Sequence, residues 1–311
     1  MKFFFHSMDL APRLNVDPAR LIGLVLSLVL LPFQASNAAG TGFSPLGERQ
    51  IPGLTELSGL AVSGLQQDHH WALNDSGHAA SLFELDENLN LVREIAISQV
   101  LNRDWEDLAS FQLDGIPYLL VADTGNNFRL RSEVSLILLR EPAPGASRAT
   151  PERIIRFRFE DGSRDCEALA VDVQNRQILL ADKGRKPGGL YRLPLDAEPG
   201  QVHTAKRIAD IPAFSPLSRD TPTAMDLSAD GRTLALAGTG HLSIFTRASG
   251  QTWQSAVEQP QRQLRLPRVR GIESIAWNHD GTAVLIGTEG QTAKFFRMHL
   301  SRVRSSKSTT P

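Results

Sequence analysis

The segment Asn102-Arg-Asp-Trp-Glu-Asp-Leu-Ala109, followed by Tyr118-Leu-Leu-Val-Ala-Asp-Thr-Gly125, sets a pattern that recurs along the chain. Each copy has a polar residue before a short apolar run, then a gap, a second apolar run and a closing glycine. The other copies are Thr55–Ala61 with Trp71–Gly77, Asp165–Ala170 with Ile178–Gly184, Thr223–Ser228 with Leu234–Gly240, and Gly271–Ala276 with Val284–Gly290. Self-similarity at a step of roughly 50 to 60 residues indicates a repeat architecture.

Two columns of residues emerge when the copies are aligned on the first small residue after each polar start. The first column is Ser58, Glu106, Glu167, Met225 and Glu273. The second is Asp75, Asp123, Asp182, Gly238 and Thr288, each followed by a variable residue and a glycine. Because hairpin turns often need a positive φ, we expect one at each closing glycine, namely Gly77, Gly125, Gly184, Gly240 and Gly290.

The repeat length suits a four-stranded antiparallel unit, which is one blade of a β-propeller. We therefore predict an all-β fold: a single β-propeller of five four-stranded blades over residues 40–300. The fifth copy lacks an outer strand, and residues 45–53 contain an unassigned strand. We expect this N-terminal strand to pair with Lys294–His299 and close the last blade, which removes an exposed edge. A six-bladed ring with one unrecognised copy is the alternative.

The N-terminus has the features of a secretory signal peptide. Basic residues precede the apolar run Leu21–Leu31, and Ser36-Asn-Ala38 is a small-residue cleavage site. We therefore assign residues 1–38 to a signal and predict a periplasmic or secreted protein with no stable membrane span after cleavage; an uncleaved anchor is the alternative. The single cysteine, Cys166, excludes an internal disulfide. The Ser/Thr-rich basic segment 301–311 is predicted to be a disordered tail.

Composition and motifs exclude several function classes. The chain has 311 residues with a formal net charge of −1, and it has no basic stripe, so we expect no nucleic-acid binding. It contains no Gly-x-Ser-x-Gly elbow, no P-loop, no dinucleotide-binding glycine motif and no His-Glu-x-x-His. Serine-hydrolase chemistry of the usual kind is therefore not supported.

The first column predicts a metal site. In an antiparallel blade, the first strand begins on the face where the second strand ends, so both columns should surround one mouth of the channel. Glu106, Glu167 and Glu273 would then crowd together, and such carboxylates need protons or a cation. Oxygen ligands in irregular geometry favour calcium, with Ser58 as a further ligand. The alternative is that each Glu is solvated or paired with a neighbouring blade.

The second column supplies candidate catalytic groups. Asp75 and Asp123 are candidate general bases, although an Asp in a turn often only caps its own backbone. Lys183 and Arg185 stand on either side of Gly184, where the third copy ends, and could neutralise an anionic, phosphate-like ligand. A solvated loop is the alternative for these basic residues.

Two resemblances add to these inferences. The motifs Asn74-Asp-Ser-Gly77, Asp104-Trp-Glu-Asp-Leu-Ala109 and Asp123-Thr-Gly-Asn-Asn127 resemble those of a family of exported bacterial β-propeller proteins of mostly unassigned function. The chain is also similar, more distantly, to the calcium-activated nucleotidases (apyrases), five-bladed propellers in which Glu and Ser residues at the starts of the innermost strands hold an axial calcium. This resemblance implies ligands at Ser58, Glu106, Glu167 and Glu273, and Met225 departs from the serine expected there.

Two functions fit the sequence. One is a monomeric calcium-dependent hydrolase of a phosphorylated or other anionic small molecule. The other is a non-catalytic binding or scaffold propeller in which the metal is structural and the loops hold a protein partner of unknown identity.

Overall fold

The computed structural model describes residues 42–183, 187–214 and 220–300. The predicted signal segment, the predicted tail and Arg185 lie outside these residues. The described part is all-β, as predicted, and its helices are short: α1 (Trp253–Ala256) and the single turns η1 (Val173–Asn175) and η2 (Pro212–Phe214). No helix among the described residues is both long and apolar enough to cross a membrane.

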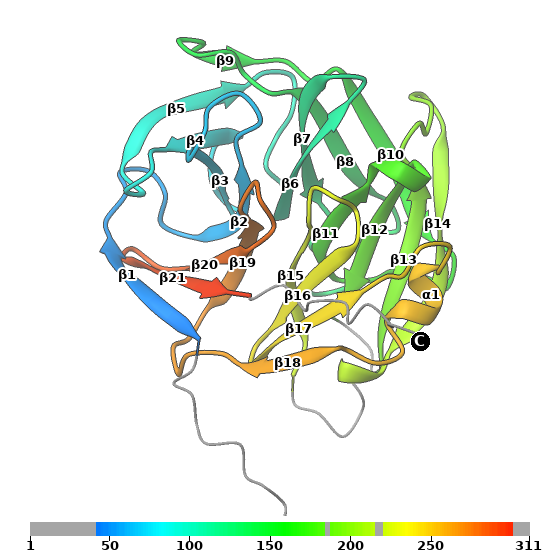
Figure 1. The fold of residues 1–311 in the computed structure, drawn as a ribbon. Coiled ribbons are helices and arrows are strands. Elements are labelled where there is room, and N and C mark those ends of the chain that lie inside the picture. Colours follow the sequence, from blue (N-terminus) through cyan, green and yellow to red (C-terminus); the bar gives the residue numbers. More distant parts are fainter. Residues whose placement is uncertain (1–41, 184–186, 215–219, 301–311) are drawn as a thin grey trace, which may run out of the picture. The chain divides into compact units, whose positions relative to one another are not determined.

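The strands form five antiparallel sets of four (Figure 1). The first set is β2 (Leu57–Val62), β3 (His70–Asn74), β4 (Ser81–Leu85) and β5 (Leu91–Ile97), with the short β9 (Arg148–Ala149) added in parallel. The second is β6 (Trp105–Leu113), β7 (Ile116–Asp123), β8 (Val134–Arg140) and β10 (Arg153–Phe159). The third is β11 (Cys166–Asp172), β12 (Gln177–Asp182), β13 (Gly188–Pro194) and β14 (Val202–Ile211).

The fourth set is β15 (Pro222–Leu227), β16 (Thr233–Gly238), β17 (His241–Thr246) and β18 (Arg262–Arg265). The fifth is β19 (Ile272–Trp277), β20 (Ala283–Thr288) and β21 (Ala293–His299), completed by β1 (Phe43–Arg49). Parallel pairing of β10 with β14 joins the second and third sets into one eight-stranded sheet.

The N-terminal strand closes the last set, as the sequence predicted. β1 pairs with β21 from Phe43 opposite Met298 to Arg49 opposite Ala293. The strand begins slightly earlier than the predicted 45–53. Its pairing covers the edge of β21, which would otherwise present unpaired backbone groups.

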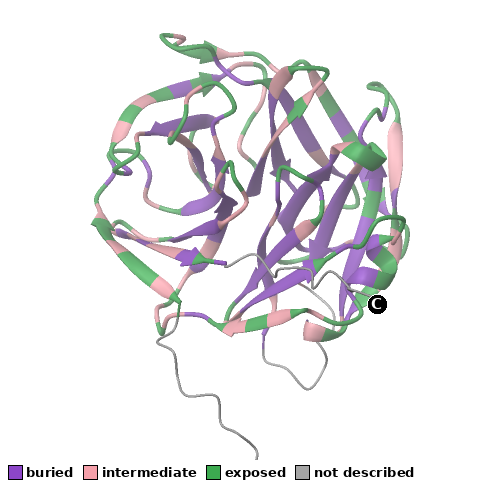
Figure 2. Ribbon diagram, viewed as in Figure 1, coloured by how far each residue is buried: buried purple, intermediate pink, exposed green. Residues whose placement is uncertain are grey.

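The first strands of the five sets are neighbours in space. β2 lies beside β6, β6 beside β11, β11 beside β15, β15 beside β19, and β19 beside β2. The apolar core lies between successive sets, because each buried cluster draws its residues mainly from two adjacent sets. Trp71 and Trp105, for example, are fully buried between the first and second sets. Burial is concentrated on the first three strands of each set, whereas outer strands such as β5 and β18 alternate with exposed residues (Figure 2).

Three polar side chains satisfy backbone groups on the free edges of the first strands. Asp107 on β6 accepts hydrogen bonds from the N–H groups of Leu169 (2.7 Å) and Met225 (3.2 Å), on β11 and β15. Asp226 on β15 accepts one from the Trp277 N–H of β19 at 2.7 Å. The Ser58 hydroxyl on β2 donates to the backbone carbonyls of β6. These bonds tie neighbouring first strands together, because buried backbone groups need partners.

We expect Asp107→Ala to destabilise the protein by about 2–6 kcal/mol. The substitution leaves the buried N–H groups of Leu169 and Met225, on two neighbouring strands, without this acceptor, and each costs about 1–3 kcal/mol. Urea unfolding followed by tryptophan fluorescence measures the loss. Asp196→Ala is the matched control, since Asp196 makes only an exposed 3.6 Å ion pair with Arg176. Equal midpoints for the two variants would show that Asp107 does not tie the strands.

Candidate metal centre

Every first strand carries one extra residue near its start. The pairing register with the second strand jumps over Ser58, Glu106, Glu167, Thr223 and Glu273. Such a β-bulge leaves the extra residue out of the ladder and re-aims its side chain. Four of these residues are those that the sequence placed in the first column.

The fourth member of that column is Thr223, and the assignment of Met225 is wrong. Ala224 pairs with Ala237, so the alignment on Ser228 was displaced by two residues. Met225 is buried and its N–H binds Asp107. Thr223 also is buried, and its hydroxyl has no hydrogen-bond partner among the described residues. The column therefore consists of two hydroxyls and three carboxyls.

The sequence alignment of the second column is wrong by one residue in the first set, where Asn74 and not Asp75 occupies the equivalent position. Asn74 stands opposite Leu57, as Asp123 stands opposite Trp105 and Asp182 opposite Cys166. Asn74 holds the preceding loop by accepting from the N–H groups of Thr55 and Glu56, both at 2.9 Å. Asp75 therefore occupies the following position, which Lys183 and Glu289 occupy in the third and fifth sets.

Four carboxyl groups converge on that of Glu106. Its carboxylate belongs to two groups in which the oxygen atoms lie within 4.8 Å of one another. The first group joins Glu106 to Asp75 and Asp104, and the second joins it to Asp165 and Glu167. The structure thus brings the predicted Glu106 and Glu167 together with Asp75, which sequence reasoning had named only as a base.

Sequence reasoning missed Asp104 and Asp165. Each lies two residues before the bulged Glu of its set, so the motif Asp-x-Glu occurs in both Asp104-Trp-Glu106 and Asp165-Cys-Glu167. This repeated spacing was the signal that could have identified them. The intervening Trp105 and Cys166 are fully buried in the core, which anchors both motifs. Burial also raises the pKa of the Cys166 thiol well above its usual value.

Glu273 lies near the cluster but is paired differently. Burial, followed by the neighbouring Glu289 carboxyl, raises the pKa of Glu273 to about 7. The charges of Lys183 and Asp75 act on it as well. The Glu289 side chain therefore acts on Glu273 in the same direction as burial, by disfavouring its charged form.

The cluster carries more negative charge than the nearby bases neutralise. Burial raises the pKa of Glu106 well above its usual range, and Asp75, Asp104 and Asp165 add to the effect. The pKa values of Asp75 and Asp104 are raised too, in each case mainly by burial. Among the described residues, the Lys183 ammonium forms an ion pair with Glu167, and the charge of Arg131 acts on Asp104. Crowded carboxyls of this kind bind protons or a further cation.

The backbone at Gly125 fits closely around these carboxyls. A Cβ at this position would lie 2.0 Å from Glu106 Oε1 and 2.4 Å from Asp104 Cγ, so only glycine allows the approach. The expected positive φ is found at Gly77 (81°) and Gly290 (111°). It is absent at Gly125 and Gly240, where the expectation was wrong, and Gly184 lies outside the described residues.

The remaining predicted site residues have other partners. The Ser58 hydroxyl donates to the carbonyls of Trp105 (2.9 Å) and Glu106 (2.6 Å), at the base of the cluster. Asp123 belongs to neither group of converging carboxyls, and its carboxylate forms an ion pair with Arg131 at 2.8 Å. Arg131 also donates to the Gly125 carbonyl at 2.9 Å, so Asp123 fixes the loop behind the cluster.

Two large apolar side chains project from that loop. Phe128 is 86% exposed and Leu130 is 85% exposed. The loop is attached to the cluster, because the Asn126 N–H donates to Asp165 Oδ1 at 2.7 Å. The Asn126 side chain closes the loop by bonding to the backbone of Arg131.

Comparison with known proteins assigns no family to the chain. A scan against protein-family models found no match, and a search of curated proteins found none either. Among solved structures, hydrazine synthase from Kuenenia stuttgartiensis is similar over 75% of this chain and 68% of its own, with 13% identity and a TM-score of 0.42. A likeness at that level carries no argument about function.

Stability of the metal-free protein should fall as the pH rises from about 4.5 to about 7. Glu106 and Glu273 have raised pKa values in the fold, so the folded state holds more protons than the unfolded state in this window. The stability that Glu106 and Glu273 contribute is fully present below their pKa in the unfolded chain. It is lost as the pH rises through their pKa in the folded protein. Thermal melts in EDTA at pH 5, 6, 7 and 8 measure the trend.

The matched control for that trend is Glu106→Gln, which should flatten the slope without removing it. Asp182 and Asp226, with pKa values raised by burial to about 6 and about 7, still titrate in this variant. An unchanged slope would mean that Glu106 ionises normally in the fold.

Proposed function

We propose that residues 42–300 form a five-bladed β-propeller. The five sets of strands would be the blades, and their first strands would surround the axis. Support comes from the neighbour relations of these strands, which run from β2 through β6, β11, β15 and β19 back to β2. Apart from the two-residue β9, every described strand belongs to one of the five sets, which leaves none for a sixth blade.

The protein's proposed function is to bind a hard divalent cation at the cluster around Glu106, and calcium fits best. The observation that carries this proposal is that Glu106 belongs to two triads of carboxyls at once. All five groups offer oxygen, the ligand that calcium prefers, and neither histidine nor cysteine is among them. Thr223 supports the fit, since its buried hydroxyl lacks a partner among the described residues.

The proposed activity is hydrolysis of a phosphorylated or other anionic small molecule. A bound calcium would supply Lewis-acid polarisation of a substrate oxygen. Lys183 is half-buried at the cluster and would attract the substrate's negative charge once Glu167 no longer engages its ammonium. Asp75 is the better-placed general base, because it lies in the cluster whereas Asp123 is paired with Arg131. Arg185 stays a second candidate for substrate binding. On the strength of the predicted signal, the proposed location of this activity is the periplasm or outside the cell.

Calcium titration of EDTA-treated protein by calorimetry tests the cation site. We expect Glu106→Gln to weaken calcium binding by about 100-fold, because the shared ligand is lost. Thr223→Val, which removes only the hydroxyl, should weaken it by about tenfold or less. Glu56→Gln is the matched control, since Glu56 precedes Ser58 but pairs with His78 at 3.1 Å. Wild-type affinity in Glu106→Gln would refute the assignment.

Lys183→Met should separate binding from hydrolysis. Removing the ammonium next to Glu167 takes away a competing positive charge, so calcium should bind about tenfold more tightly or better. Turnover of anionic substrates should fall in the same variant. The screen covers nucleotides, phosphomonoesters and lactones, each with and without calcium. Lys294→Met, which removes an exposed lysine paired with Glu48, is the control.

The outcomes of that screen are distinguishable. Calcium-independent or absent turnover of every substrate would reject the hydrolase and leave the cation site standing. Unchanged calcium affinity in Lys183→Met would show that the ammonium does not compete for the site.

The exposed loop favours a second candidate function, a non-catalytic binding propeller with a structural cation. Phe128 and Leu130 present apolar surface beside the cluster, and Asp165 connects the loop to it. A large exposed apolar pair of this kind suits a protein partner. Under this function, replacing both residues with Ala would abolish partner binding and leave calcium affinity unchanged.

A further inference from the structure

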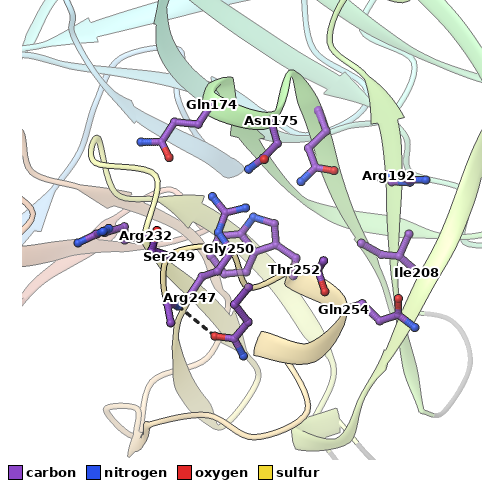
Figure 3. A pocket seen from close by; sticks show the side chains of 14 residues that line it. Gln174, Asn175, Arg192, Ile208, Arg232, Arg247, Ser249, Gly250, Thr252 and Gln254 are labelled. Atoms are coloured by element: carbon purple, nitrogen blue, oxygen red, sulfur yellow. Dashed lines mark hydrogen bonds between the residues drawn. The ribbon is translucent and has the colours of Figure 1, made fainter.

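A second cavity lies between the third and fourth sets of strands (Figure 3). Its volume is about 540 Å³, which is within the range of small-molecule sites. One wall is formed by Gln174, Asn175 and Gln177 and by Arg192 of β13, and the other by the segment from Arg247 to Gln254, which enters α1. The cavity lies beyond the end of β11, whereas Glu167 lies at the start of that strand. The seven residues of β11 place the two sites roughly 20 Å apart.

Four lining side chains bond to one buried carboxylate, which offsets the charge of Arg247. The Asp172 carboxylate accepts hydrogen bonds from Arg247 and from the Trp253 indole, both at 2.8 Å. Arg247 is buried and stacks on the Trp253 ring with its guanidinium carbon 4.7 Å from the ring centroid. Asn175 (2.7 Å) and Gln177 (3.1 Å) donate to the same carboxylate through their amide nitrogens. Their amide oxygens therefore remain as acceptors.

The upper part of the cavity is positively charged. No lining residue carries a carboxylate, and Arg192 and Arg232 are both exposed. Among the described residues, neither guanidinium has an ion-pair or hydrogen-bond partner. Figure 3 shows these two side chains on opposite sides of the cavity, with the amides of Gln174, Asn175 and Gln254 around the space between them. The lining thus combines two separated cations with a set of amide donors and acceptors.

We propose that this cavity binds an acidic sugar, a short saccharide that bears carboxylate groups. Guanidinium groups bind carboxylates through two parallel hydrogen bonds, and two separated arginines suit two separated anionic groups better than one compact anion. Amide side chains, which both donate and accept, match sugar hydroxyls. The scarcity of apolar lining residues, chiefly Ile208 and Trp253, disfavours an apolar ligand. The proposal does not depend on the cation site.

Calorimetric titration with trigalacturonate tests it, with galactotriose as the uncharged probe and inorganic sulfate as the compact anion. We expect trigalacturonate to bind at least tenfold more tightly than either. Arg192→Ala and Arg232→Ala should each weaken its binding by about tenfold or more, since each loses a charge-assisted hydrogen-bonded pair. Both residues are exposed, so the variants should keep the wild-type melting temperature.

Arg265→Ala is the matched control, since it removes an exposed arginine of β18 outside the cavity lining. It should bind trigalacturonate like the wild type, and so should Glu106→Gln. Sulfate or galactotriose binding as tightly as trigalacturonate would overturn the proposal. Equal losses in Arg265→Ala and Arg232→Ala would overturn it too, because binding would then follow overall charge rather than this cavity.

Discussion

One extra residue at the start of each first strand is the constraint on which the candidate site depends. The extra residue has no pairing partner on the neighbouring strand. The resulting β-bulge changes the direction of its side chain from the one that regular alternation would give. Because the bulge recurs in all five sets, Ser58, Glu106, Glu167, Thr223 and Glu273 occupy equivalent positions. The backbone register therefore determines that these side chains lie at equivalent positions, and their charges then determine what the cluster can bind.

The crowding that results must be offset locally. Lys183 offsets part of the charge through Glu167, and the raised pKa of Glu273 favours its uncharged form. Glu106 has no ion-pair partner among the described residues, and burial together with Asp75, Asp104 and Asp165 raises its pKa well above its usual range. A divalent cation would serve the same purpose as these protons. Proton binding and cation binding at the cluster should for that reason compete.

The sequence was sufficient for the all-β class and for the pairing of β1 with β21, because both follow from counting strands in a repeat. It also aligned Glu106 and Glu167 at equivalent strand positions, since strong apolar runs fix the register of those copies. Thr223 and Asp75 were misjudged because an alignment by residue type cannot detect a slip of one or two residues, whereas backbone pairing fixes it. Gly125 was attributed to a positive φ, but its reason is a three-dimensional contact with Asp104 and Glu106.

Hydrogen bonding distinguishes structural carboxylates from functional candidates in this protein. Asp107 and Asp172 are fully buried, and each accepts three or more hydrogen bonds from the described residues. Such carboxylates connect strands and loops, and because their oxygen atoms already accept several hydrogen bonds, they are poorly available to a ligand. The Glu106 carboxylate is also buried, yet among the described residues no donor reaches it. A buried acid without donors is costly to ionise alone, so its position beside four other acids supports the proposed cation site.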